Sequence, residues 1–162
     1  MPTLTRRLVE ADIDLVVAFS LAAWAPVFAG LEEQLGAPIF RLIFPDWEDA
    51  QGRAVRAVCS APENEVWVAV HGDRPVGFVA IGFIDEDAAR AGEIYMIAVD
   101  PDHQRRGVAT ALLHRALTRI EAEGVDLAVI ATGGDPGHAP ARALYERFDF
   151  TPLEQVRYYR KM

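Results

Sequence analysis

The sequence predicts a mixed α/β (α+β) fold, in which an antiparallel first half is followed by alternating strands and helices. Two β-rich runs, residues 65–71 and 75–84, flank Gly72-Asp73, a dipeptide typical of a two-residue hairpin turn. From residue 92 onward, apolar runs of strand character alternate with amphipathic runs of helical character. This order indicates a mixed sheet with helices on its faces.

Length and composition indicate one globular domain over residues 1–162. The chain is 51% hydrophobic and 25% charged, which is typical of a folded domain large enough to bury its own core. The formal net charge of −8 at pH 7 provides no basic face for nucleic acid and would repel an anionic membrane surface. We therefore expect neither nucleic acid nor a membrane as a partner, and a cationic small molecule suits the chain better.

The single cysteine, Cys59, excludes an intramolecular disulfide, and no Cys/His spacing suggests a zinc site. We expect a buried thiol, no metal and a cytoplasmic location. Residues 15–29 faintly resemble a secretory signal, but Glu10, Asp12 and Asp14 stand where such a segment has no acids. Pro26 and the short length of the run argue against a membrane span.

The N-terminal half is predicted to begin with a strand over residues 3–9 and an amphipathic helix that starts at residues 10–12. Between residues 24 and 47, prolines and glycines predict short helices separated by loops. Helical character returns over residues 46–60. The elements expected after the hairpin are a loop at 85–90, a strand at 92–99, a helix from Gly107 to Gly124, a strand at 127–131, a loop at 133–137, a helix from about Pro140 and a last strand at 155–161.

The junction between the strand at 92–99 and the next helix is a candidate anion site. Asp100-Pro101 stops the strand, and a basic turn containing Gly107 opens directly into the helix. The first backbone N–H groups of a helix have no intrahelical partner and lie at the positive end of the peptide dipoles. Such a helix start binds phosphate or pyrophosphate without a dedicated side chain.

Two motifs in this half carry a family resemblance. The run from Gln104 to Ala109, QRRGVA, resembles the Q/R-x-x-G-x-G/A signature of GNAT-type N-acetyltransferases. The run from Ala141 to Phe150, ARALYERFDF, is similar to the A-x-x-L-Y-E-x-x-G-F segment of the same family. The resemblance covers residues 91–150 and implies a GNAT-like acyl-CoA N-acyltransferase fold, with a mixed, centrally splayed β-sheet flanked by helices.

The resemblance also implies an activity. The chain would move an acetyl group from acetyl-CoA to a primary amine of a small molecule or protein, by direct attack in a ternary complex. The backbone at the helix start would bind the pyrophosphate, and the preceding strand would pair with the extended pantetheine arm. The residues that the resemblance assigns to the cofactor are Ile97, Ala98, Val99, Arg105, Arg106, Gly107, Val108, Ala109, Thr110 and His138.

Glu93 and Tyr145 are the candidate catalytic residues. Some members of the family place a glutamate at the position of Glu93 as general base, and strand alternation predicts Glu93, Tyr95, Ile97 and Val99 on one face. An ordinary solvated carboxylate is the alternative. Tyr145 corresponds to the family tyrosine that protonates the departing thiolate, and a core aromatic is its alternative.

Two positions depart from the family pattern. His138 stands where the family often has an asparagine, so its contact with the cofactor is open. Asp149 replaces a frequent glycine after the last helix, and we expect local backbone strain there.

The acceptor is the least specified part of the prediction. In this family the region before the hairpin shapes the acceptor pocket, and aromatics with acids suit an amine. The residues in question are Trp24, Phe28, Phe40, Phe44 and Trp47 with Glu32, Glu33, Asp46 and Glu48. A non-catalytic acyl-CoA-binding regulatory module is the alternative function. The acyl-chain preference and the oligomeric state stay open, with a homodimer among the alternatives.

Overall fold

The computed structural model describes residues 3–162, which form two compact units. The first, here called the sheet unit, contains residues 3–23 and 51–131. The second, the helical unit, contains residues 24–50 and 132–162. The expectation of a single domain over residues 1–162 stays a prediction.

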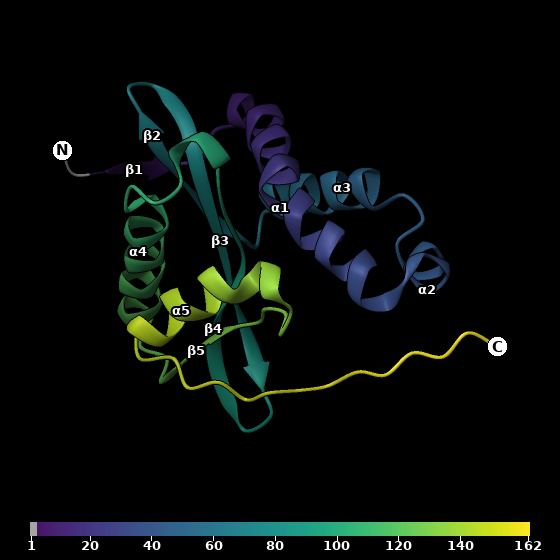
Figure 1. The fold of residues 1–162 in the computed structure, drawn as a ribbon. Helices are drawn as coiled ribbons and strands as arrows, with labels where there is room; N and C mark the ends of the chain where they lie inside the picture. Colours follow the sequence, from purple (N-terminus) through teal and green to yellow (C-terminus); the bar gives the residue numbers. More distant parts are fainter. Residues whose placement is uncertain (1–2) are drawn as a thin grey trace. The chain divides into compact units, whose positions relative to one another are not determined.

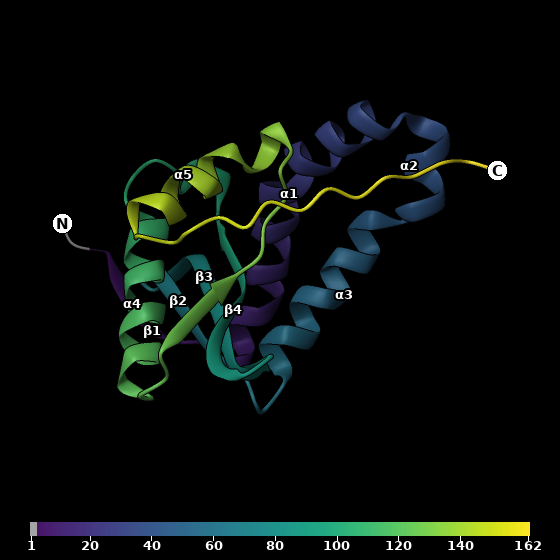
Figure 2. The ribbon, with the colours of Figure 1, turned by 90° about the horizontal axis from the view of Figure 1, so that it is seen from below.

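A five-stranded mixed sheet forms the sheet unit (Figures 1 and 2). The strands are β1 (Leu4–Arg7), β2 (Glu65–His71), β3 (Arg74–Glu86), β4 (Ala89–Val99) and β5 (Leu127–Ile130), in that spatial order. The first four pair antiparallel, and β5 lies parallel to β4. The predicted mixed sheet is confirmed, and the loop expected at residues 85–90 is mostly a continuation of β3 and β4 around a tight turn.

The sheet is splayed beside β4. Strand β5 pairs only with residues 91–94 of β4, whereas β4 continues to Val99. The second half of β4 therefore has β3 on one side and no strand of the described chain on the other. Because a backbone without a ladder partner keeps its N–H and C=O groups available, this half can receive an extended ligand.

A β-bulge at Tyr95 changes which side chains share a face of β4. Ala80 pairs with Met96 and Ile81 with Ile94, so Tyr95 is an extra residue with no direct partner in β3. The prediction that Glu93, Tyr95, Ile97 and Val99 share one face was therefore wrong. Strict alternation holds only for an unbulged strand, and the extra residue turns Ile97 and Val99 to the opposite face from Glu93.

Helix α4 (Val108–Ala122) covers one face of the sheet. A Cβ atom on Gly92 of β4 would lie 2.5 Å from the side chain of Ile120, so the glycine permits close helix–sheet packing. The side chains buried on the helix are Val108, Leu112, Leu113, Ala116 and Ile120, which confirms most of the predicted apolar stripe. The opposite face packs against the start of α1 (Ile13–Leu35), where the rings of Phe19 and Phe78 are 6.3 Å apart.

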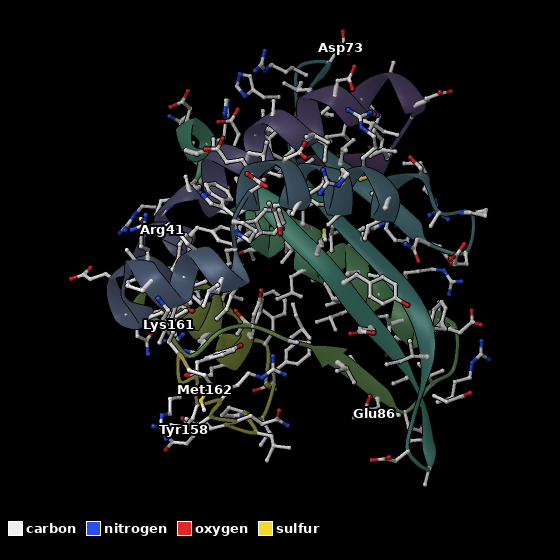
Figure 3. All side chains as sticks on the ribbon, turned by 90° about the vertical axis from the view of Figure 1, so that its right-hand side faces the viewer. Arg41, Asp73, Glu86, Tyr158, Lys161 and Met162 are labelled. Atoms are coloured by element: carbon white, nitrogen blue, oxygen red, sulfur yellow. The ribbon has the colours of Figure 1, made fainter. Side chains whose placement is uncertain are left out.

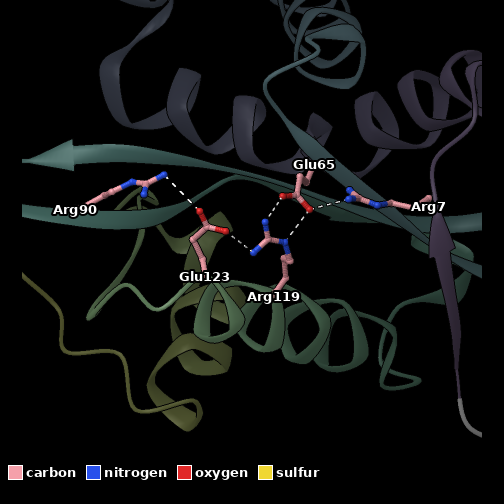
Figure 4. Close-up of polar contacts among 5 residues, drawn as sticks. All are labelled: Arg7, Glu65, Arg90, Arg119 and Glu123. Atoms are coloured by element: carbon pink, nitrogen blue, oxygen red, sulfur yellow. Dashed lines mark hydrogen bonds and ion pairs between the residues drawn. The ribbon is translucent and has the colours of Figure 1, made fainter.

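Ion pairs tie α4 to three strands of the sheet unit (Figure 4). Glu65 of β2 accepts hydrogen bonds from Nε and Nη2 of Arg119 at 3.0 and 2.6 Å, and from Nη2 of Arg7 in β1 at 2.7 Å. Arg119 also donates to Glu123 at 2.9 Å, and Glu123 lies 3.5 Å from Arg90 of β4. The guanidinium groups of Arg119 and Arg7 hold the pKa of Glu65 below its usual value, although burial alone raises it.

The aromatic-rich region is more helical than the sequence suggested. Residues 24–35 continue α1 through Pro26 and Gly30, so the predicted break into short elements was wrong there. A helix tolerates one missing N–H when the surrounding residues are good helix formers, and Ala, Leu, Glu and Gln make up most of residues 24–35. Gly36, with φ of 76°, separates α1 from α2 (Ala37–Ile43), and α3 (Trp47–Ser60) follows.

One helix among the described residues, Glu10–Leu35, is long and apolar enough to cross a membrane by length and composition. It combines the short 3-10 turn η1 (Glu10–Asp12) with α1, and its apolar window has a mean hydropathy of 1.8. A core helix or a signal sequence has the same features. The expected absence of a membrane partner therefore stays a prediction.

The chain after helix α5 (Ala139–Arg147) has no regular secondary structure. The predicted strand at 155–161 was wrong, because an alternating sequence forms a strand only with a ladder partner. Leu153, Val156 and Tyr158 are 75–90% exposed, and Figure 3 shows the end of this segment at Tyr158, Lys161 and Met162. Asp149, just before the segment, has φ of 62°, a left-handed backbone state that agrees with the local strain expected there.

Candidate active site

The predicted anion site lies at the start of α4, in the sheet unit. Gly107 is the N-cap residue in the left-handed conformation, with φ of 81° and ψ of 4°. No side chain caps this end, and the first turn contains no acid. The free N–H groups of Val108, Ala109 and Thr110 and the positive helix end are therefore available to an anion.

The loop before α4 is held by contacts that the sequence did not reveal. The Nε2 atom of Gln104 donates to the carbonyl of Val99 at 3.1 Å, which ties the loop to the end of β4. The buried Asp100 accepts from the N–H of Asp102 at 3.1 Å and caps the short 3-10 turn η2 (Pro101–His103). Arg105 adopts φ of 60°, an uncommon backbone state for a residue with a side chain. Arg105 and Arg106 are exposed beside Gly107.

The three strand residues assigned to the pantetheine arm lie in the splayed half of β4. Ala98 and Val99 are each 7% exposed, and Ile97 is half-buried. Ile97 pairs with Val79 of β3, so its other backbone edge is directed away from the ladder. The strand edge and the helix start thus adjoin through the loop at 100–107, as the resemblance implies.

Glu93 lies on β4 opposite Gly82, on the face that packs against α1. Burial raises the pKa of its carboxyl group, and the negative charge of Glu86 raises it further. Tyr95, from the same face, lies directly over Gly82 and would overlap any side chain there. A half-buried carboxylate with a raised pKa is a better proton acceptor than a solvated one.

Tyr145 lies on α5, in the helical unit, and is 8% exposed. Burial raises the pKa of its phenol to about 12. The phenol therefore stays protonated at neutral pH, so it can donate a proton or a hydrogen bond in a reaction there. Its ring centroid is 6.1 Å from that of Phe150, so Tyr145 also has the aromatic packing expected of a core aromatic, the alternative role for this residue.

His138 belongs to a small polar cluster in the helical unit. Its Nδ1 atom lies 2.5 Å from Oδ1 of Asp135, whose side chain is 4% exposed. Both residues belong to the turn that leads into α5: Asp135 occupies the N-cap position of η3 (Pro136–His138), and His138 that of α5. Sequence reasoning singled out His138 but missed Asp135, although the i, i+3 spacing before a helix was a usable signal.

The predicted acceptor aromatics pack chiefly against one another. The rings of Phe28 and Trp47 stack with centroids 4.2 Å apart, and Phe44 meets Phe28 edge-on at 5.5 Å. Phe40 contacts Phe44 at 5.3 Å. This cluster holds α1, α2 and the start of α3 together within the helical unit. A direct contact of these rings with an acceptor stays a prediction.

The two units divide the candidate residues between them. The sheet unit holds Glu93, the strand residues 97–99 and the helix start at 105–110, whereas the helical unit holds His138 and Tyr145. Within residues 3–162, no cluster of three or more His, Cys, Asp or Glu could hold a metal ion. Cys59 is buried as expected, and burial raises the pKa of its thiol to about 11, which makes it a poor nucleophile.

Comparison with known proteins identifies the family to which these features belong. The model of the acetyltransferase (GNAT) family matches residues 32–150. Mycothiol acetyltransferase from Beutenbergia cavernae is 39% identical over 97 residues, which are 56% of this chain and 32% of that protein. The chain thus spans about a third of the length of this relative.

Solved structures share the fold over the whole chain. A mutant of the BH1408 protein from Bacillus halodurans aligns with a TM-score of 0.75 at 14% identity, covering 99% of this chain and 100% of that one. The aminoglycoside acetyltransferase AAC(6')-Iy, in complex with a CoA bisubstrate analogue, aligns with a TM-score of 0.66 at 17% identity and covers 100% of this chain and 99% of that one.

Proposed function

The chain belongs to the GNAT family of acetyltransferases, and on this premise we propose that it transfers an acetyl group from acetyl-CoA to a primary amine of a small molecule or protein. The observation that carries the proposal is the start of α4. A left-handed glycine at the N-cap, no capping side chain and no acid in the first turn leave the helix open to a diphosphate.

Donor binding is assigned to the sheet unit. The N–H groups of residues 105–110 would bind the pyrophosphate of acetyl-CoA, with Arg105 and Arg106 adding positive charge. The free edge of residues 97–99 would pair with the amide-bearing arm, as an added strand does. Bound in this way, acetyl-CoA supplies an activated acyl group, and the N–H groups near Ile97 and Ala98 would stabilise negative charge on its carbonyl oxygen.

Proton transfer is assigned to two further residues. Glu93 would accept a proton from the acceptor, directly or through water, because its raised pKa makes it a stronger base than an exposed carboxylate. Tyr145 would donate a proton to the leaving sulfur, because its phenol stays protonated. Neither role requires a covalent enzyme intermediate or a metal.

The acceptor is proposed to be cationic in water. The net charge of −8 favours approach of an ammonium ion, and the family relative AAC(6')-Iy is an aminoglycoside acetyltransferase. We extend the proposal to a cytoplasmic location, where acetyl-CoA is available.

A coupled screen tests the proposal. Purified protein is incubated with acetyl-CoA and a panel of small amines and peptide N-termini, while free thiol and the mass of the acceptor are both measured. We expect an amine-dependent release of thiol with a matching mass gain of one acetyl group. In parallel, calorimetry should detect binding of CoA and acetyl-CoA.

The two measurements separate the alternatives. Binding without transfer to any amine would support a non-catalytic acyl-CoA-binding module. Absence of binding by folded protein would refute both. Glu93→Gln should lower kcat and leave the affinity for acetyl-CoA within about twofold. If kcat and the affinity for acetyl-CoA fell by the same factor, Glu93 would not be the base.

A further inference from the structure

Asp135 and His138 form a buried acid–imidazole pair that the proposed reaction does not yet use. Oδ1 of Asp135 lies 2.5 Å from Nδ1 of His138, and Oδ2 is buried with no hydrogen-bond partner. The side chain of Asp135 is 4% exposed and that of His138 is 22% exposed. The carboxylate is therefore withdrawn from water, while part of the imidazole is accessible.

The surrounding backbone is shaped to keep this pair in place. Nη1 of Arg142 donates to the carbonyl groups of Gly133 and Asp135 at 2.6 and 2.8 Å, so α5 clamps the loop. A Cβ on Gly133 would collide with Oδ1 of Asp135 and lie 2.6 Å from Nδ1 of His138. A Cβ on Gly137 would lie 3.0 Å from Oδ2 of Asp135 and 3.0 Å from Val27 of α1. Two glycines thus leave room for the pair.

The charge of the pair determines the state of the ring. Burial alone raises the pKa of Asp135, but the hydrogen bond and charge of His138 outweigh this and hold it below its usual value. An ionised carboxylate only accepts hydrogen bonds, so Nδ1 must carry the proton. With its proton on Nδ1, the ring presents the lone pair of Nε2 on its other side.

Acetylation of an ammonium ion needs such an acceptor. The acceptor nitrogen loses two protons between ammonium and amide, while its C–N bond forms and the C–S bond of the donor breaks. One proton ends on the departing sulfur and the other reaches solvent. An imidazole, with an ordinary pKa of ~6.5, takes a proton from an ammonium of ~10.4 about a hundredfold more readily than a carboxylate of ~4.3 does.

We propose that His138 accepts the first proton from the acceptor ammonium at Nε2, and that Asp135 is its positioning residue. This rests on the proposed acetyl transfer and assigns Glu93 to the second proton. If the ring of His138 only bound a ligand, a neutral carbonyl group would be enough to orient it. The partner is instead the ionised carboxylate of Asp135, which is kept out of water and is suited to a ring that becomes positively charged during the reaction.

Steady-state kinetics against pH tests the role of His138. In His138→Asn, kcat/KM for the amine should fall about a hundredfold near pH 7, with acetyl-CoA affinity within twofold. The loss should shrink as the pH approaches the pKa of the acceptor ammonium, and it should be smaller for less basic amines. Arg142 of α5 and Val27 of α1 contact this loop, and Arg142 is the charged group among these neighbours. The substitution leaves Arg142 and its charge in place.

Asp135→Asn keeps the shape of the side chain and removes its charge, so kcat/KM should fall about tenfold with the same pH trend. Nitrogen NMR gives a readout independent of activity. The ring signal of His138, assigned by its disappearance in His138→Asn, should show the Nδ1–H tautomer in the native protein. Gly133→Ala should disturb this tautomer, whereas Gly134→Ala, where a Cβ meets nothing within 4 Å, should not.

Three results would overturn the inference. One is an Nε2–H tautomer in the native protein. Another is a loss in His138→Asn that is constant across pH and amine basicity and accompanied by weaker acetyl-CoA binding, which would make His138 a cofactor contact. The third is unchanged kinetics in His138→Asn while native protein acetylates amines. Native protein that neither binds CoA nor acetylates any amine would instead refute the proposed function.

Discussion

The sheet unit and the helical unit are held together by different kinds of interaction. In the sheet unit, continuous backbone ladders connect five strands, and α4 is fixed by buried apolar side chains and by the ion pairs of Glu65. In the helical unit, no strand is present among the described residues, and order depends on the stacked aromatics around Phe28 and on the Arg142 clamp. The sheet unit distributes its stability over many backbone hydrogen bonds between strands, whereas the packing of the helical unit depends on a few side chains.

The proposed tasks follow this division in part. The proposed donor-binding backbone belongs to the sheet unit, which suits a role in which main-chain groups must keep fixed positions. Of the residues that we propose to move protons, Tyr145 and His138 belong to the helical unit and Glu93 to the sheet unit. We therefore expect substitutions in the donor-binding backbone to change affinity for the donor, and substitutions at the three proton-transfer residues to change turnover.

The largest expected effect comes from Tyr145→Phe, which removes one oxygen from the helical unit. Turnover should fall about a hundredfold, because the sulfur loses its proton donor, while the Kd for acetyl-CoA stays within twofold. Steady-state kinetics and calorimetry check this. Tyr158→Phe, at a tyrosine that is 90% exposed, is the matched control and should change neither quantity. Equal turnover in both variants would exclude Tyr145 as a donor.

Trp47→Ala tests how the helical unit is held together. Removing the ring stacked on Phe28 should lower the free energy of unfolding by about 2 kcal/mol, since Trp47 is half-buried. Hydrogen exchange should accelerate over residues 24–50 and stay slow in β2 and β3. Leu42→Ala, at a leucine that is 67% exposed, is the control. Equal acceleration in both units would contradict the comparison.

Gly107→Ala tests the sheet unit. The left-handed backbone costs an alanine about 1–2 kcal/mol, so the substitution should distort the helix start that we propose binds the phosphates. We expect acetyl-CoA to bind about tenfold more weakly, with little change in turnover at saturation. Gly30→Ala, within α1, has no atom within 4 Å of the new Cβ and should leave binding unchanged. A turnover defect without an affinity defect in Gly107→Ala would break the proposed division of tasks.

Glu65→Gln should have the smallest effect, a loss of about 1 kcal/mol near pH 7, because the ion pairs are partly exposed. The folded pKa of Glu65 lies below its unfolded value, so its contribution is complete above the unfolded pKa and disappears as pH falls through the folded one. Urea unfolding of both proteins should therefore converge at low pH. Glu121→Gln, at an exposed glutamate of α4, should match the native protein throughout.

The sequence predicted the sheet unit better than the helical unit for a physical reason. The β-rich runs of the hairpin, the Gly72-Asp73 turn and the stripe on α4 are local patterns, and each matched its element. Alternation failed in β4, where the bulge at Tyr95 depends on how the strand pairs with β3. Residues 155–161 have a strand pattern but no partner in a ladder, and α1 passes through Pro26 although proline usually ends a helix.

The candidate site was predictable where it depends on backbone geometry. Gly107 was expected at a helix start and occupies it in a left-handed state. The contacts of Gln104 with Val99 and of Asp135 with His138 were not, because each depends on how a loop folds back in space. The position of a residue in a motif indicates that it lies near the site. The partner of its side chain can be identified only from the three-dimensional structure.

The extra residue in β4 acts as a spacer in this strand. Ile94 and Met96 already lie opposite the consecutive residues Ile81 and Ala80, so deleting Tyr95 would give a regular ladder in which Ile97 and Val99 keep their side of the sheet. Deleting Ile97 instead would shift Ala98 and Val99 by one position against β3, and each would then exchange one face for the other. A single codon lost beyond the bulge would therefore disrupt the proposed donor binding more than one lost at the bulge itself.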